Sequence, residues 1–149
     1  TEVDGTRCIV EQQDLVYRDD PGVDAPKRQP EPAPTDADVS ETVTPSEVLL
    51  FRYSALTFNG HRIHYDRRYA SDVEGYDGLV VHGPLTATLL AELAADTGGE
   101  LATFSFRGVS PLLDTAPFSI HGRRSESGMD LWAANPSGGL AMTANATFR

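Results

Sequence analysis

Residues able to do acid–base chemistry are concentrated in one short stretch of the chain. Two histidines, an asparagine and an arginine stand within six residues: Asn59, His61, Arg62 and His64. An imidazole changes charge near neutral pH, so a histidine can accept a proton and return it within one reaction. A third histidine opens the sequence His82-Gly83-Pro84, sixteen residues after Asp66. We expect the two stretches to face each other across one substrate site.

A metal site is the competing interpretation of the histidine cluster. His61 and His64 have the spacing His-x-x-His, and such a pair can chelate a metal ion. A zinc site takes at least three protein ligands, and no further cluster of Cys or His completes the set. Cys8 is the only cysteine, which also excludes a disulfide within the chain. We therefore predict no metal site.

Composition excludes several classes of function. The net charge of −10 argues against nucleic-acid binding, which needs a basic surface. No run approaches the about 18 apolar residues that a membrane span requires, and the first residues are acidic, unlike a secretory signal. With 149 residues, we expect one soluble, intracellular domain with a core of its own.

A short helix is predicted just before the histidine stretch. Thr44 is a candidate N-cap, Pro45 suits the first helical position, and Glu47 takes the third position of a capping box. The apolar residues that follow indicate a helix ending near Thr57. This helix would hold one end of the site stretch.

The stretch itself is predicted to be a loop, followed by a second short helix. Asn59-Gly60 is a strong turn dipeptide. Asp66 is a plausible cap for a helix that runs to about Val73, and we interpret it as a cap rather than an acid. Arg67 and Arg68 are then expected on a solvated helix face.

The most apolar segment, residues 83–98, is predicted to be a buried helix. Leucines line one face of this segment and small alanine side chains occupy much of the remainder, so most of the helix surface should be buried. Pro84 near its start and Gly98 near its end fit the preferences of helix termini.

Four strands are expected after this helix, at residues 100–109, 117–125, 128–135 and 139–148. The last shows the clearest alternation of apolar and polar side chains. No helices alternate with these strands, so the sheet should be antiparallel. The fold class is therefore α+β, with an antiparallel sheet wrapped around one long buried helix.

The first 44 residues differ from the rest. Residues 6–17 are rich in β-branched and apolar side chains and predict a strand. Residues 18–44 hold five of the ten prolines and seven acidic residues, and they predict a linker or an extended arm lying on a surface. The main domain would then span residues 45–149.

Three motifs carry a resemblance to a known family. They are Phe51-Arg52-Tyr53-Ser54-Ala55-Leu56-Thr57, Asn59-Gly60-His61-Arg62-Ile63-His64-Tyr65-Asp66 and Gly78-Leu79-Val80-Val81-His82-Gly83-Pro84-Leu85. Their order resembles the MaoC-like dehydratases, which have a hot-dog fold. The similarity is greatest to the mesaconyl-CoA and itaconyl-CoA hydratase branch and to the mitochondrial-type 3-hydroxyacyl-thioester dehydratases.

The resemblance implies roles for the site residues. His64 matches the histidine of the broad family's Asp-x-Asn-Pro-x-His signature, in which the aspartate and the histidine activate a water. Asn59 stands in the place of that aspartate, where it has no carboxylate and can only orient water or substrate. The backbone N–H of Gly83 would stabilise the thioester oxygen, and Arg62, with its planar guanidinium, would bind a substrate carboxylate or CoA phosphates. His61 and His82 complete the substrate-binding set, although a buried, hydrogen-bonded structural role fits His82 as well.

The resemblance also implies a reaction and partners. The reaction is an (R)-type hydration of an α,β-unsaturated acyl thioester or the reverse dehydration, with mesaconyl-CoA or itaconyl-CoA as the favoured substrate and no cofactor. Many relatives are double hot dogs, so residues 1–17 would be the tail of a preceding half, and the chain would form a homo-oligomer or pair with another hot-dog chain. The expected location is the cytoplasm, with the mitochondrial matrix as the alternative. The alternative function is a non-catalytic half that binds acyl thioesters or supports an active partner.

Overall fold

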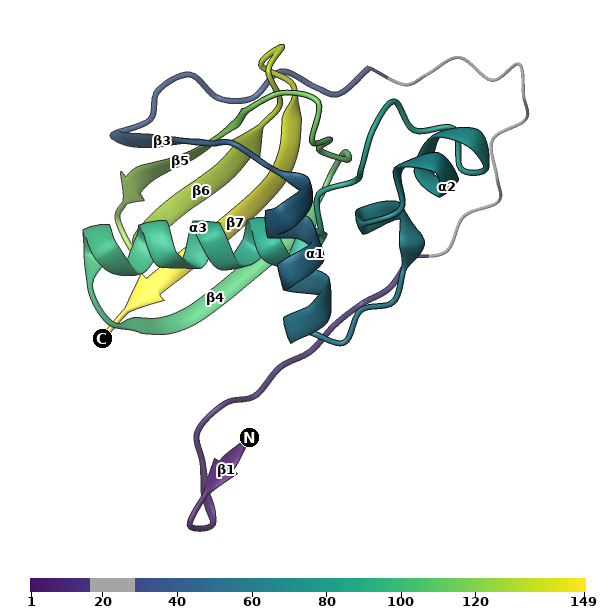
Figure 1. Cartoon of the computed structure of the whole chain (residues 1–149). Coiled ribbons are helices and arrows are strands. Elements are labelled where there is room, and N and C mark those ends of the chain that lie inside the picture. The colour runs from purple at the N-terminus through teal and green to yellow at the C-terminus, as the bar shows by residue number, and fades with distance from the viewer. Residues whose placement is uncertain (17–28) are drawn as a thin grey trace.

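A five-stranded antiparallel sheet forms the body of the computed structural model, which describes residues 1–16 and 29–149 (Figure 1). The helix α3, Gly83–Gly98, lies across one face of this sheet. The α+β architecture predicted from the sequence is confirmed. In sheet order the strands are β3 (Val39–Val43), β5 (Phe118–Ser125), β6 (Gly128–Ala134), β7 (Leu140–Phe148) and β4 (Leu101–Gly108).

The core lies between α3 and the sheet. Leu90 and Ala94 of α3 are fully buried, as the apolar character of the helix predicted. From the sheet, Ile120, Leu131 and Ala144 point into the same cluster. The four predicted strands after α3 all form, and each of their bounds lies within one residue of the prediction. Alternation of apolar and polar side chains made them predictable, because it marks the residues that reach the core.

Three short helices stand at one end of α3. They are α1 (Glu47–Leu56), the 3₁₀ turn η1 (Arg62–His64) and α2 (Arg67–Asp72). The Asp66 cap is confirmed, since its carboxylate accepts a hydrogen bond from the backbone N–H of Tyr69 at 3.0 Å. The predicted Thr44 cap is wrong. Ser46 caps α1 by accepting from Leu49 N at 3.2 Å, because the chain stays extended through Val43 and the helix begins only at Glu47.

The predicted strand over residues 6–17 is confirmed at Thr6–Arg7 and is wrong for residues 8–16. Only β1 (Glu2–Val3) and β2 (Thr6–Arg7) form, as a small hairpin, and residues 8–16 are exposed and outside any strand. A strand needs a partner for its backbone groups, and within the described residues only Cys8 and Ile9 of this segment find one, in Thr1: Cys8 N donates to Thr1 O at 3.0 Å, and the Thr1 ammonium donates to Ile9 O at 2.9 Å. Tyr17 lies outside the described residues. That residues 1–17 are the tail of a preceding half stays a prediction.

The linker predicted for residues 18–44 is wrong at its C-terminal end. Residues 39–43 form β3, which pairs with β5 from Val39 opposite Gly122 to Val43 opposite Phe118. Residues 29–38 form an extended arm against the sheet, as Ala33 N donates to Gly138 O at 2.8 Å. Residues 18–28 lie outside the described part. The sheet therefore begins at Val39, before the domain start predicted at residue 45.

No helix in residues 1–16 or 29–149 is long and apolar enough to cross a lipid bilayer.

Candidate active site

The loop between α1 and η1 is shaped by its own polar groups. Phe58, just after α1, has a left-handed backbone with φ of 53°. The backbone N–H of Asn59 donates a hydrogen bond to Ser54 O in α1 at 2.9 Å. The side-chain oxygen of Asn59 accepts the backbone N–H of His61 at 3.0 Å, which closes an Asx turn. The Tyr65 hydroxyl donates to Gly60 O at 2.8 Å. The loop is thus fixed by hydrogen bonds before any ligand is bound.

His64 is held in one tautomer by a backbone carbonyl. Its Nδ1 lies 2.7 Å from Val80 O, and since a carbonyl oxygen only accepts, Nδ1 carries the proton. Val80 N donates to Ile63 O at 3.0 Å, so the same residue also fixes the η1 backbone. Nε2 makes no hydrogen bond with the described residues and is not one of their enclosed unpartnered atoms. This nitrogen is therefore the one left for water or substrate.

The environment keeps His64 neutral at neutral pH. Burial of the ring lowers the His64 pKa below its usual value of 6.5, the hydrogen bond to Val80 O opposes that shift, and nearby His61 adds to the lowering. Only 7% of the residue is exposed, which is why burial is the first cause. A neutral imidazole with a free Nε2 is the form that a general base requires.

His82 lies directly against His64 instead of across an open site. The two rings stack with centroids 3.7 Å apart and planes 17° from parallel. His82 is fully buried, and its Nε2 is 2.8 Å from the Ser54 hydroxyl in α1. Burial and then the neighbouring His64 lower the His82 pKa to about 4. The two stretches are therefore in direct contact through their histidine rings, and that they line one substrate site stays a prediction.

The open side of the site is at Gly83, the first residue of α3. Gly83 is exposed, and a Cβ added there would meet no atom within 4 Å. Beside it is a recess of about 180 Å³, to which Thr86, Ser110 and Met142 also contribute. The unpaired N–H groups and the partial positive charge of a helix N-terminus favour an anionic oxygen at such a place.

The two other proposed binding residues lie on the exposed side of η1. His61 is exposed and meets His64 edge to face, with ring centroids 5.5 Å apart. The Arg62 guanidinium pairs with Asp66 at 2.7 Å and lies 4.1 Å above the centre of the Tyr69 ring. In this conformation the Arg62 guanidinium is occupied by the N-cap residue of α2 and by a ring of that helix. Its role in binding substrate, like those of His61, His82, Asn59 and Gly83, stays a prediction.

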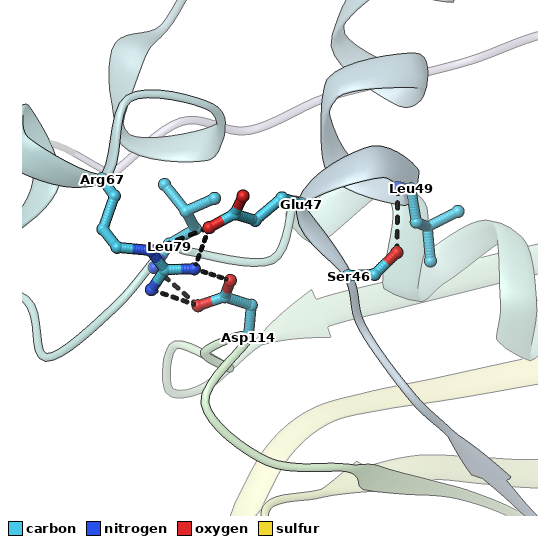
Figure 2. Close-up of polar contacts among 6 residues, drawn as sticks. All are labelled: Ser46, Glu47, Leu49, Arg67, Leu79 and Asp114. Atoms are coloured by element: carbon cyan, nitrogen blue, oxygen red, sulfur yellow. Dashed lines mark hydrogen bonds and ion pairs between the residues drawn. The ribbon is translucent and has the colours of Figure 1, made fainter.

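An ion-pair network behind the site was missed by sequence reasoning. The Arg67 guanidinium contacts Asp114 and Glu47, each at 2.6 Å, and so joins α2, the loop before β5 and the start of α1 (Figure 2). Asp114 also accepts Leu79 N at 2.8 Å. The prediction of a solvated helix face therefore misses the ion pairs of Arg67. It fits Arg68, whose side chain is 94% exposed. The available signal was Asp114 itself, an acidic residue directly after the apolar pair Leu112-Leu113.

Ser54 was the second functional residue missed. It stands within the apolar helix α1, is buried, and its hydroxyl lies 2.8 Å from His82 Nε2. Among residues 1–16 and 29–149, no group of three or more His, Cys, Asp or Glu side chains is placed to hold a metal ion.

Comparisons with known proteins agree on the class of domain. Mesaconyl-C(4)-CoA hydratase of Chloroflexus aurantiacus is 52% identical over 139 residues, which cover 92% of this chain and 49% of that protein. The (R)-hydratase from A. caviae involved in PHA biosynthesis has a TM-score of 0.64 at 16% identity, over 82% of this chain and 97% of that one. A MaoC-like dehydratase from Phytophthora capsici has a TM-score of 0.64 at 18% identity, over 89% of this chain and 46% of that one. These structures confirm the hot-dog fold.

The chain spans about half the length of the curated hydratase that it matches. It corresponds to nearly all of the A. caviae protein, so the described fold is one hot-dog unit. The family model for hydroxyacyl-thioester dehydratase type 2 matches residues 1–114, which include all the site motifs. The chain therefore belongs to the hydroxyacyl-thioester dehydratase type 2 family and has the hot-dog fold.

Proposed function

We propose that this chain is the catalytic hot-dog unit of a hydro-lyase that adds water to an α,β-unsaturated acyl thioester, or removes it from the 3-hydroxyacyl thioester. In the direction of hydration, His64 Nε2 takes a proton from water while the water oxygen bonds to the β carbon. The electrons of the double bond move to the thioester oxygen, which becomes enolate-like. The imidazolium of His64 then returns the proton to the α carbon, so that one water is added in all.

The N-terminus of α3 supplies the second requirement of this reaction. The backbone N–H of Gly83 is placed at the open start of the helix, where it can donate to the enolate oxygen as charge develops. Hydration leaves the overall oxidation level of the substrate unchanged, so we propose that no redox cofactor takes part. CoA or a carrier protein enters only as the thioester part of the substrate.

The tautomer of His64 carries this proposal. Val80 O holds the Nδ1 proton, so Nε2 is a neutral acceptor without a partner among the described residues. His64→Ala should lower kcat for hydration of mesaconyl-CoA and crotonyl-CoA by at least about 100-fold. The matched control is His121→Ala, which removes an imidazole of β5 that has no role in the proposed reaction. Equal activity of the His64→Ala variant and the unaltered protein would refute the assignment.

We favour mesaconyl-CoA or itaconyl-CoA as substrate. The relative from Chloroflexus aurantiacus, named mesaconyl-C(4)-CoA hydratase, supports a short dicarboxylic acyl group. Arg62 would bind the free carboxylate after leaving Asp66, with which it now forms an exposed ion pair. Arg62→Ala should therefore raise KM for mesaconyl-CoA and leave KM for crotonyl-CoA, whose acyl group has no carboxylate, within about twofold. An equal change in KM for both substrates would refute the proposal that Arg62 binds the acyl carboxylate.

A second hot-dog unit is the partner that we propose. The recess at Gly83 holds about 180 Å³, less than the roughly 300 Å³ or more of most ligand pockets, so one unit encloses a substrate incompletely. The edge strand β4 is exposed along most of its length, with Phe106 about half exposed. Either a second copy or a separate chain would cover these surfaces. Light scattering of the purified chain, alone and with a candidate partner, distinguishes the two.

The alternative function is a non-catalytic unit that binds acyl thioesters. Asn59 favours it, because an amide stands where the broad family has an aspartate and its oxygen is already used by His61 N. Calorimetric binding of crotonyl-CoA without any loss of its enoyl absorbance, both alone and with a partner unit, would favour this function over the hydro-lyase.

A further inference from the structure

His82 is buried among aromatic and polar neighbours that fix its position. Its ring stacks on His64, and its centroid lies 4.9 Å from that of Tyr53. Its Nε2 is hydrogen-bonded to Ser54 at 2.8 Å. The other nitrogen, Nδ1, is enclosed and has no partner among the described residues. A buried imidazole that leaves one polar atom unsatisfied is costly, so its presence calls for a physical reason.

We propose that His82 is a positioning residue for His64, and that Ser54 holds His82 for this purpose. This inference rests on the proposed function of His64 as the base. The His82 ring covers one face of the His64 ring, while Val80 O holds the Nδ1 edge. Rotation of His64 about its side chain would break the stack and the hydrogen bond together. The two contacts therefore aim Nε2 in one direction.

His82 does not serve as a second base or acid. Both of its nitrogens are withdrawn from the site, because Nε2 meets Ser54 and Nδ1 is enclosed. With its pKa lowered to about 4, it stays neutral while His64 gains and loses a proton. A neutral ring can lie against the imidazolium of His64 without charge repulsion, whereas a second cation at this distance would oppose it.

The stack also controls the solvation of His64. Burial is the first cause of the low His64 pKa, and the His82 ring supplies that burial on one face. In the described part of the chain, the other titratable group against His64 is His61, which meets it edge to face from η1. The Tyr53 ring of α1 lies against the other residue of the stack, His82. Removal of the His82 ring should therefore admit water to His64 and raise its pKa towards 6.5.

Two substitutions separate the ring from the hydrogen bond. His82→Phe keeps an aromatic ring on His64 and loses the bond to Ser54. His82→Gln keeps an amide N–H near Ser54 and loses the ring. If stacking is the function, His82→Gln should lower kcat by about tenfold or more with KM within about twofold, while His82→Phe stays within about threefold of the unaltered protein.

The His64 pKa gives a readout that does not depend on turnover. Titration of the His64 ring protons by NMR should show a low pKa in the unaltered protein and in His82→Phe, and a pKa closer to 6.5 in His82→Gln. Ser54→Ala is a third variant with a small loss of volume. It leaves both nitrogens of the buried His82 ring without a partner, which favours movement of that ring off His64, whereas the apolar ring of His82→Phe needs no partner. Ser54→Ala should therefore change kcat and the His64 pKa in the same direction as His82→Gln, by about two- to fivefold in kcat. If His82→Phe does not fold, Ser54→Ala tests the positioning role of His82 in its place.

The outcomes are distinct. If His82→Gln and Ser54→Ala fold and leave both kcat and the His64 pKa unchanged, the positioning role is overturned. The same holds if His82→Gln is more active than His82→Phe, because the hydrogen bond and not the ring would then be what matters. If the unaltered protein shows no hydration but the His64 pKa still rises in His82→Gln, the stack is retained as a solvation device and the proposed function alone fails.

Discussion

Arg67 offers a quantitative test of how the site is held. Its guanidinium lies against Asp114, whose side chain is 3% exposed, and Asp114 has one further donor, Leu79 N. Arg67→Met would leave this carboxylate buried with a single hydrogen bond. Breaking a fully buried ion pair in this way costs about 3–5 kcal/mol.

The expected loss is smaller here because Arg67 is partly in water. Its side chain is 46% exposed, so water can replace part of the guanidinium on Asp114. The contact with Glu47 is exposed and adds at most about 0.5 kcal/mol. We expect Arg67→Met to lower the free energy of unfolding by about 2 kcal/mol, which corresponds to a fall in Tm of about 4–8 °C for a domain of this size.

Urea unfolding followed by circular dichroism measures this loss, and Arg68→Met is the matched control. Arg68 is the neighbouring arginine, 94% exposed and 3.9 Å from Asp72, so its removal should change stability by less than about 0.5 kcal/mol. Asp114→Asn in the Arg67→Met background should restore stability, since it removes the unpaired charge and keeps an acceptor for Leu79 N. Equal effects of the two arginine variants, or strict additivity in the double variant, would refute the reasoning.

Three further predictions concern single positions. The His82 pKa is lowered to about 4 in the folded state, so the unfolded state binds more protons below pH 6.5. The free energy of unfolding should therefore fall by up to about 3 kcal/mol between pH 6.5 and about pH 4. Urea unfolding at these two pH values should show a smaller fall for His82→Phe. Gly83→Ala should leave the fold intact, since its Cβ meets nothing, but reduce kcat/KM for acyl-CoA because the methyl group enters the open site; equal kcat/KM would exclude Gly83 from the binding site. Gly128→Ala should destabilise by about 2 kcal/mol or more, because its Cβ would collide with the backbone oxygen of Ala146 in the neighbouring strand, whereas Gly60→Ala, with free space around it, should not.

Strands and helices that bury one regular face were predictable from the sequence. In β7 the buried Met142, Ala144 and Ala146 alternate with the exposed Thr143 and Asn145, and this pattern alone places the strand. The edge strand β3 was not predictable in the same way. Its sequence, Val-Ser-Glu-Thr-Val, is compatible with a strand but is short and follows a segment rich in proline and acidic residues. What makes it a strand is pairing with β5, some 80 positions later in the chain, and no local pattern indicates that pairing.

The site was predictable in its members but not in their arrangement. Spacing and resemblance identified His64, His82 and Gly83. The stack of the two rings depends on a contact between a loop and a helix cap, and no periodicity encodes it. The roles of Ser54 and Asp114 were not predicted for the same reason. A serine in an apolar helix and an aspartate in a loop become informative only once their hydrogen-bond partners are known.

The apolar run Leu79-Val80-Val81 connects the ion-pair network to the two histidines. Leu79 N donates to the Asp114 carboxylate, and Val80 holds η1 with its N–H and His64 with its carbonyl. The next residue after the run is His82, whose ring lies on His64. Because Val80 O fixes the His64 tautomer on which the proposed reaction depends, displacement of this segment would break the hydrogen bond from His64 Nδ1. The distant Arg67 pair should therefore affect kcat as well as stability: an Arg67→Met variant that is fully folded at low temperature should still lose activity, and Arg68→Met should not.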